Sequence, residues 1–228
     1  RLSAIETISA IFGKILCDNM HKFITYFKDK IFHPFSTEEF EKLAIELFHF
    51  QLEYNGVYKK FSKLLGVDNP QSIQEIPFLP IELFKTEKIL IDGSAPKFTF
   101  HSSGTGNGTR SKHFIIDIDI YKKALLTSFN IHIGDPTEYC ILALCPSYIN
   151  NPNSSLAFML NELIKKSKNN RSGFYLNKIN DLQRVLLEVE RKNQKTILFG
   201  LSFALLDFIE EHRFRLKHTI IMETGGTK

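Results

Sequence analysis

The sequence predicts an α/β fold, in which a helical N-terminal lead-in is followed by a mixed sheet flanked by helices. Apolar residues recur at helical spacing through the first 85 residues, as amphipathic helices require. From Lys88 onward, short apolar runs of strand length alternate with helical patterns. We therefore divide the 228 residues into a helical region, 1–87, and an α/β body, 88–228.

The helical region carries a start signal and a stop signal. Ser36 and Glu39 are spaced as a capping box, with Ser36 as the N-cap. Pro77 and Pro80 break the helical pattern and predict an extended connector. Between these signals, an apolar stripe at helical spacing predicts a packed helix face: Phe40, Leu43, Ala44, Leu47 and Phe48.

The α/β body alternates strands with helices. The runs expected to form strands are 97–100, 113–116, 139–144, 196–199 and 218–222. The helical patterns that separate most of them are 121–129, 155–167, 182–191 and 203–212. Strands joined through helices favour parallel pairing, so we expect part of the sheet to be parallel.

The composition excludes several classes of protein. With 29 Lys+Arg against 25 Asp+Glu the net charge is +4, and the basic residues do not cluster, so no nucleic-acid partner is expected. The most apolar N-terminal stretch, 8–17, is shorter than the roughly 20 residues of a spanning helix, so no membrane span is expected. Cys17, Cys140 and Cys145 form no C-x-x-C pair, which fits a cytoplasmic protein.

Residues 100–113 form the strongest candidate site. Between two expected strands they combine hydroxyls and cations with Gly104, Gly106 and Gly108. Glycines let the backbone N–H groups of such a loop surround an anion, and hydroxyls and a lysine add donors, as a polyphosphate requires. The spacing is that of neither a Walker A loop nor a dinucleotide fingerprint, and a plain hairpin loop is the alternative.

Three further segments are candidates. Residues 200–204 have the setting of a nucleophile elbow with the last glycine replaced by alanine, but too little sequence follows for a catalytic triad. We therefore expect Ser202 to cap the following helix. Residues 146–155 and 223–226 each leave the carboxyl end of an expected strand, where open α/β sheets bind ligands, although plain turns have the same composition.

Taken together, these segments resemble a known family. Ser102-Ser103-Gly104-Thr105, followed by Ser111-Lys112-His113, resembles the phosphate loop of acyl-adenylate-forming enzymes. The closer resemblance is to LuxE-like acyl-protein synthetases, the ligase component of the bacterial bioluminescence fatty-acid reductase complex. Further blocks of that family follow in its order from about residue 73 onward, among them 76–85, 146–148, 154–156, 173–175, 203–207 and 222–226.

The resemblance implies an adenylate-forming fold and a two-step ligase. A fatty or other carboxylic acid would attack ATP, with Mg²⁺ bridging the phosphates, and the acyl group would pass from the adenylate to a thiol of an acceptor protein such as a reductase. It implies catalytic roles for Lys112 and His113. The implied ATP-binding residues are Ser102, Ser103, Gly104, Thr105, Gly106, Gly108, Thr109, Thr224, Gly225 and Gly226. The implied acyl-pocket residues are Ser147, Tyr148, Gly200, Ser202 and Phe203, and no side chain is singled out as a metal ligand.

The sequence departs from this family in two respects. The loop reads Gly104-Thr105-Gly106-Asn107-Gly108, where the family usually has a Thr-Thr-Gly in a loop about one residue shorter. The chain also stops before the family's Tyr-Gly-x-Thr-Glu block and its acyl-accepting cysteine, which none of the three cysteines matches. We therefore expect the chain to be the N-terminal part of such an enzyme, without its C-terminal part. Such a fragment could bind nucleotide but would not catalyse the ligase reaction. The alternatives are an acyl-coenzyme A ligase of the phenylacetate-ligase type and a non-catalytic domain with the same fold.

Overall fold

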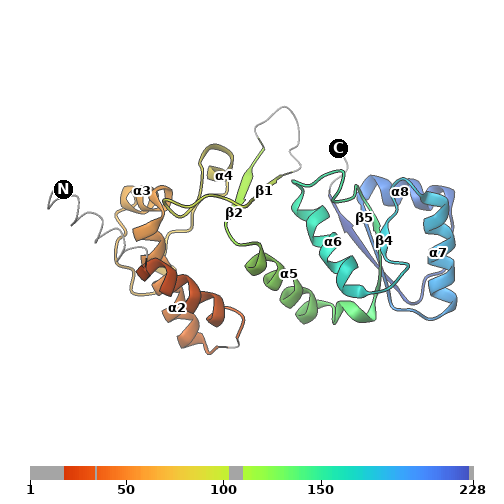
Figure 1. Ribbon diagram of the computed structural model, residues 1–228, viewed down its shortest axis with the longest axis horizontal. Helices are drawn as coiled ribbons and strands as arrows, with labels where there is room; N and C mark the ends of the chain where they lie inside the picture. The colour runs from red at the N-terminus through yellow and green to blue at the C-terminus, as the bar shows by residue number, and fades with distance from the viewer. Residues whose placement is uncertain (1–17, 34, 103–109, 226–228) are drawn as a thin grey trace, which may run out of the picture. The chain divides into compact units, whose positions relative to one another are not determined.

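The computed structural model describes residues 18–33, 35–102 and 110–225 (Figure 1). The chain forms two compact units. The first comprises Arg1–Thr99 with Gly104–Asp117, and the second comprises Phe100–Ser103 with Ile118–Lys228. Residues 88–117, which sequence alone groups with the α/β body, thus lie mostly in the first unit.

The first unit is mainly helical. A helix over residues 18–30 precedes the named elements. These are α2 (Thr37–Tyr54), α3 (Gly56–Leu64), η1 (Ile73–Glu75), α4 (Leu83–Thr86) and β2 (Lys112–Ile115). Strand β1 (Phe98–His101) begins in this unit, ends in the second and pairs with β2.

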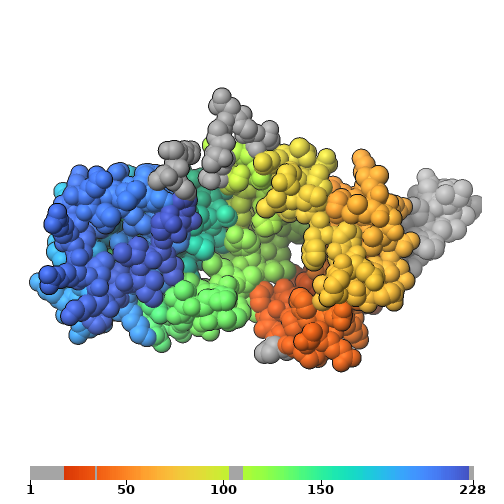
Figure 2. All heavy atoms as spheres, turned by 180° about the vertical axis from the view of Figure 1, so that it is seen from behind, coloured from red at the N-terminus to blue at the C-terminus, as the bar shows by residue number. Residues whose placement is uncertain are grey.

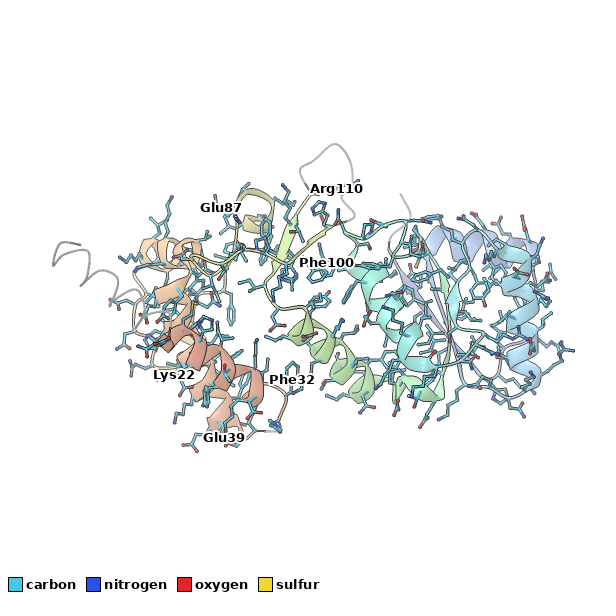
Figure 3. All side chains as sticks on the ribbon, viewed as in Figure 1. Lys22, Phe32, Glu39, Glu87, Phe100 and Arg110 are labelled. Carbon is cyan, nitrogen blue, oxygen red and sulfur yellow. The ribbon has the colours of Figure 1, made fainter. Side chains whose placement is uncertain are left out.

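The predicted capping box is confirmed. Ser36 Oγ accepts from Glu39 N at 3.2 Å, and the Glu39 carboxylate accepts from Ser36 N at 2.8 Å, at the start of α2 (Figure 3). Asn55 ends α2 and also caps α3, since its side chain accepts from Tyr58 N. The Tyr58 hydroxyl in turn donates to Pro77 O at 2.8 Å. The expected proline connector is therefore tied to α3 through a buried tyrosine.

The second unit contains a parallel sheet. Its helical elements are α5 (Ile118–His132), η2 (Pro136–Glu138), α6 (Ser155–Ser167), α7 (Ile179–Arg191) and α8 (Ser202–Glu211). Its strands are β3 (Cys140–Leu144), β4 (Gly173–Phe174), β5 (Thr196–Leu201) and β6 (Thr219–Thr224). Within the described residues these strands pair in the order β4-β3-β5-β6, and each pairing is parallel.

The sheet has a hydrophobic core on each face. Leu142 and Leu198 pack with α7 and α8 on one face, whereas Ile141 and Ile197 pack with α6 on the other. Half-buried side chains of α5 complete this second face. Both faces of β3 are therefore covered, which explains why its sequence is continuously apolar rather than alternating.

The expected α/β class is confirmed, but the strands do not form one mixed sheet. Strands β1 and β2 form a separate two-stranded sheet, and the larger sheet is parallel throughout the described chain. The sequence shows where strands form but not which of them pair, because pairing joins residues far apart in the chain. Strand β4 was not expected because its two residues are too short to carry an alternating pattern.

Candidate functional site

The carboxyl ends of β5 and β6 lie side by side at one edge of the parallel sheet. Gly200 near the end of β5 pairs with Glu223 near the end of β6. Ligands of open α/β sheets bind at this edge of the strands. The edge therefore holds the predicted acyl-pocket residues Gly200 and Ser202 together with the predicted nucleotide residues Thr224 and Gly225.

Ser202 links the two strand ends. Its hydroxyl contacts two acceptors, the Glu223 carboxylate and the Gly225 carbonyl oxygen. The expectation that this hydroxyl caps α8 is wrong, since the N-cap is Leu201 and Ser202 is the first residue of the helix, with its hydroxyl at Glu223 and Gly225. The side chain turns toward the end of β6 instead. Residues from two predicted subsites thus lie in contact.

Ser202 does not have the neighbours of a hydrolase nucleophile. The ring of His212, at the far end of α8, packs against Phe208 and Phe214 with centroid distances of 5.2 and 6.1 Å. The acidic group at Ser202 is Glu223, which contacts the hydroxyl directly rather than through an imidazole. The arrangement supports a polar binding edge rather than a catalytic triad.

Gly200 permits close packing behind this edge. A Cβ atom at this position would lie 2.6 Å from Cγ of Leu205, a buried residue of α8. Real Cβ atoms do not approach so closely, so glycine lets the first turn of α8 lie directly over the end of β5. The backbone N–H groups at the start of α8 are consequently held at the same edge of the sheet.

The loop after β3 contributes a second wall. Asn153 O accepts from His101 N at 2.8 Å, which ties the end of β1, one residue before Ser102, to this loop. Ser154 then caps α6, because its hydroxyl accepts from Ala157 N at 3.2 Å. Ser102 and the loop, predicted from sequence as parts of one site, are therefore brought together in the second unit.

The two predicted acyl-pocket residues of this loop face different environments. Ser147 Oγ accepts from Asn150 N at 3.4 Å and so stabilises the turn. Tyr148 places its ring 5.5 Å from that of Phe158, edge to face. The ring of Phe158 also lies 5.4 Å from that of Phe100 and 5.8 Å from that of Tyr121. Tyr148 thus belongs to an aromatic cluster beneath the loop.

An apolar groove of about 630 Å³ lies on the α5–α6 face of the sheet. Its volume is within the roughly 300–1,000 Å³ of small-molecule sites. Most of its lining comes from α5 and α6, and β5 and β6 contribute Phe199 and Met222 at its floor. The remaining lining residues are Tyr121, Ala124, Leu125, Ser128, Phe129, His132, Ile133, Ser155, Leu156, Met159 and Leu163.

Sequence reasoning missed this groove. The sequence analysis predicts only a helical pattern for residues 121–129, whereas Ala124, Ser128 and His132 recur every fourth position and line the groove. Small side chains one helical turn apart leave room against a neighbouring helix, and this is the signal the sequence offered. The predicted pocket residue Phe203 does not line the groove; it lies 55% exposed on α8.

The predicted catalytic residues belong to the first unit. Lys112 is exposed at the start of β2, and the ring of His113 stands edge-on to Phe84 at 5.9 Å. Partial burial lowers the pKa of His113 below its usual value, which favours the neutral imidazole. The rest of the predicted phosphate loop, residues 103–109, and Gly226 lie outside the described residues.

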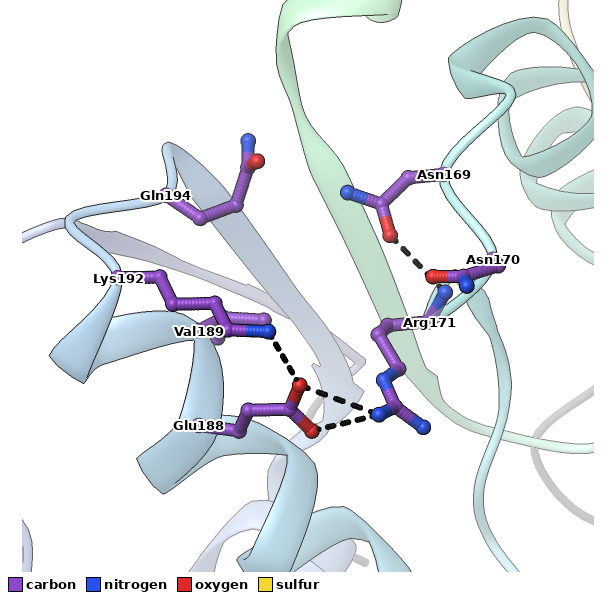
Figure 4. Close-up of a pocket in the computed structure, with 7 residues that line it drawn as sticks. All are labelled: Asn169, Asn170, Arg171, Glu188, Val189, Lys192 and Gln194. Atoms are coloured by element: carbon purple, nitrogen blue, oxygen red, sulfur yellow. Dashed lines mark hydrogen bonds and ion pairs between the residues drawn. The ribbon is translucent and has the colours of Figure 1, made fainter.

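A polar pocket of about 190 Å³ lies at the opposite, amino edge of the sheet (Figure 4). The Glu188 carboxylate accepts from Arg171 at 2.9 Å and from Lys192 at 2.7 Å, between Asn169 and Gln194. Hydrogen bonds from Lys192 and Arg171 lower the pKa of Glu188. Because these charges satisfy one another, the pocket is best explained as a surface ion-pair network.

Comparison with known proteins adds no relative: no family model, no curated protein and no solved structure matches the chain.

Among the described residues, no helix is long and apolar enough to cross a membrane. The described part of the chain also holds no group of three or more His, Cys, Asp or Glu side chains that could bind a metal ion.

Proposed function

We propose that this chain belongs to a ligase that activates a carboxylic acid with ATP as an acyl-adenylate and then passes the acyl group to a protein thiol. In this proposal the glycine-rich segment 102–112 holds the phosphates, with Lys112 offsetting their charge. Mg²⁺ would be coordinated chiefly by phosphate oxygens, as a hard cation with few protein ligands usually is. The ends of β5 and β6 would face the adenylate.

The observation that carries the proposal is the junction of the polar edge with the apolar groove. Along β5 and β6, the pair Phe199–Met222 lies on the floor of the groove, whereas the next pair, Gly200–Glu223, points to the opposite face of the sheet, toward α8, at the carboxyl ends of the strands. A ligand with its apolar tail in the groove would therefore pass the carboxyl ends of β5 and β6 to bring its head group to Ser202 at the start of α8. A ligand with a hydrocarbon tail and a polar, reactive end fits this order of surfaces.

The polar edge offers suitable groups for an adenylate. The first N–H groups of α8 are free of helical partners and carry the positive end of the helix dipole, which favours a phosphate or carboxylate. Gly225, with φ of 89°, leaves a backbone approach that a side chain would hinder. The Ser202 hydroxyl, which contacts Glu223 and the Gly225 carbonyl at this edge, is a further polar group for a ligand.

Calorimetric titration with non-hydrolysable acyl-adenylate analogues tests the proposal. We expect an analogue with a long alkyl chain to bind more tightly than its acetyl counterpart. Gly104→Val in the phosphate loop should weaken both analogues. Ala124→Trp, which fills the groove, should weaken the long-chain analogue at least tenfold and leave the acetyl analogue unchanged.

A matched control on the same helix is Asn130→Trp, because Asn130 is exposed and does not line the groove. Failure of the wild-type chain to bind either analogue would contradict the adenylate site. Retention of the chain-length preference in Ala124→Trp would contradict the groove as the tail site. Incubation with labelled acid and ATP, followed by coenzyme A or a candidate acceptor protein, would then identify the thiol.

A further inference from the structure

Helix α3 presents a basic face in the first unit. Gly56, Lys59, Lys60, Lys63 and Leu64 line a shallow hollow of about 400 Å³ at helical spacing. The lining is mainly apolar, as expected of Leu64 and the aliphatic stems of exposed lysines. We refer to these residues together with Leu65 as the α3 patch. Its atoms lie at the surface in the orange part of Figure 2.

The helix end makes the patch protrude. Gly66, with φ of 70°, follows the C-cap residue Leu65 in the left-handed conformation. Gly66 N donates to Lys63 O and Val67 N donates to Ser62 O, each at 3.1 Å, which is a Schellman motif. This motif stops the helix at a defined point and leaves Leu64 78% and Leu65 55% exposed.

The charges of the patch are not satisfied by the surrounding protein. None of the three lysines makes an ion pair with another described residue. Asp92, whose carboxylate accepts from Gly56 N at 3.2 Å, lies at the start of the helix. Lys59, Lys60 and Lys63 thus present their charge to solvent beside two exposed leucines.

We propose that the α3 patch binds the surface of an anionic lipid bilayer. Lysines attract anionic headgroups, while the leucines at the helix end can enter the interface between headgroups and acyl chains. The two leucines lie on different sides of the helix end, since consecutive residues are about 100° apart. A bilayer accepts such a tip from any side, whereas a protein groove would need a single apolar face.

The proposal does not depend on the ligase activity and is tested with the whole chain. Vesicles of phosphatidylcholine alone are compared with vesicles that contain about 30% phosphatidylserine, by co-sedimentation. We expect binding to the anionic vesicles only, and its loss at about 1 M salt, where charges are screened within about 3 Å. The triple variant Lys59→Gln/Lys60→Gln/Lys63→Gln should bind roughly tenfold or more weakly.

Two further variants separate the contribution of the leucines from that of the lysine charges. Leu64→Ser/Leu65→Ser should weaken binding while keeping its salt dependence. The control variant Lys165→Gln/Lys166→Gln/Lys168→Gln removes the same charge from the end of α6 and should bind like the wild type.

The proposal is overturned if the wild type does not bind anionic vesicles, if the control loses as much binding as the α3 variant, or if an acidic peptide binds the patch and vesicles do not. Circular dichroism would show that each variant is folded.

Discussion

Glu190 joins α7 to the segment that leads into β6. Its carboxylate accepts from Lys217 N at 3.0 Å, from His218 N at 3.1 Å and from Thr219 Oγ1 at 2.6 Å. Burial alone would raise the pKa of Glu190, but these hydrogen bonds favour the ionised form and hold it below the usual value of 4.5. A single acidic side chain thereby positions the start of the outer strand.

Replacing this carboxylate should make stability depend less on pH. Because the folded pKa lies below the unfolded one, Glu190 stabilises the fold above pH 4.5, and this contribution is lost as the pH falls through the folded pKa. We expect Glu190→Gln to lower the free energy of unfolding at pH 7 by about 1 kcal/mol. Urea unfolding at a series of pH values measures this, and the difference from wild type should vanish in acid. Glu210→Gln, on the exposed side of α8, should show no such effect.

Cys140 and Cys145 flank the buried core of the sheet. Burial raises the pKa of each thiol to about 11. At pH 8 roughly one thiol in a thousand is then ionised, and the thiolate is the nucleophilic form. Neither cysteine is therefore expected to accept an acyl group.

In a Cys17→Ser background, a chromogenic disulfide reagent should label these two thiols only when denaturant unfolds the chain. Stoichiometric labelling of the native protein within the time of mixing would contradict this prediction. The labelling rate of the denatured protein serves as the control, because it shows that both thiols react with the reagent once they are exposed.

At the scale of the elements, the contact between α8 and β5 depends on the lack of a side chain at Gly200. Gly200→Ala would force Leu205 out of its buried position, and overpacking of this kind costs about 1–3 kcal/mol. We expect a lower Tm by differential scanning calorimetry. Gly173→Ala is the control, because its Cβ would meet Tyr175 at an ordinary 3.6 Å. Equal shifts for the two variants would contradict the packing argument.

Local signals predicted several elements well. Helix α6 has the expected bounds, and the capping box at Ser36 starts α2 as expected. These features depend on residues within one or two helical turns. The separation of β1 and β2 from the parallel sheet depends on contacts across long stretches of sequence, which no local pattern encodes.

The candidate site could be predicted from the sequence only in part, because some of its features depend on local patterns and others on contacts between distant residues. That Ser202 and the segment 223–225 lie at one edge follows from the rule that ligands bind where parallel strands end. That Ser202 turns to Glu223, and that α5 leaves a groove beside α6, depends on how side chains meet in three dimensions. Lys112 and His113 remain predictions in their catalytic roles.

At the scale of the whole molecule, each unit has a buried core of its own. Phe48, Phe50 and Tyr58 are buried in the first unit, while the clusters around β3 and β5 belong to the second. Destabilising one unit should therefore leave local unfolding in the other unchanged.

Hydrogen exchange measured by mass spectrometry tests this independence with the Gly200→Ala variant. We expect faster exchange in α7, α8 and the parallel strands, with α2 and α3 exchanging as in the wild type. Uniform acceleration along the chain would show instead that the protein unfolds as a single cooperative unit.

The strand order of the parallel sheet also determines when each strand can pair during synthesis on the ribosome. Strand β3 lies between β4 and β5, and Cys140 pairs with Thr196, which leaves the ribosome much later. At about 5–20 residues per second, the wholly apolar β3 waits roughly 3–10 seconds for its second neighbour. Dark-blue β6, visible at the surface in Figure 2, comes later still. During synthesis, β3 is therefore the segment on which a chaperone would act.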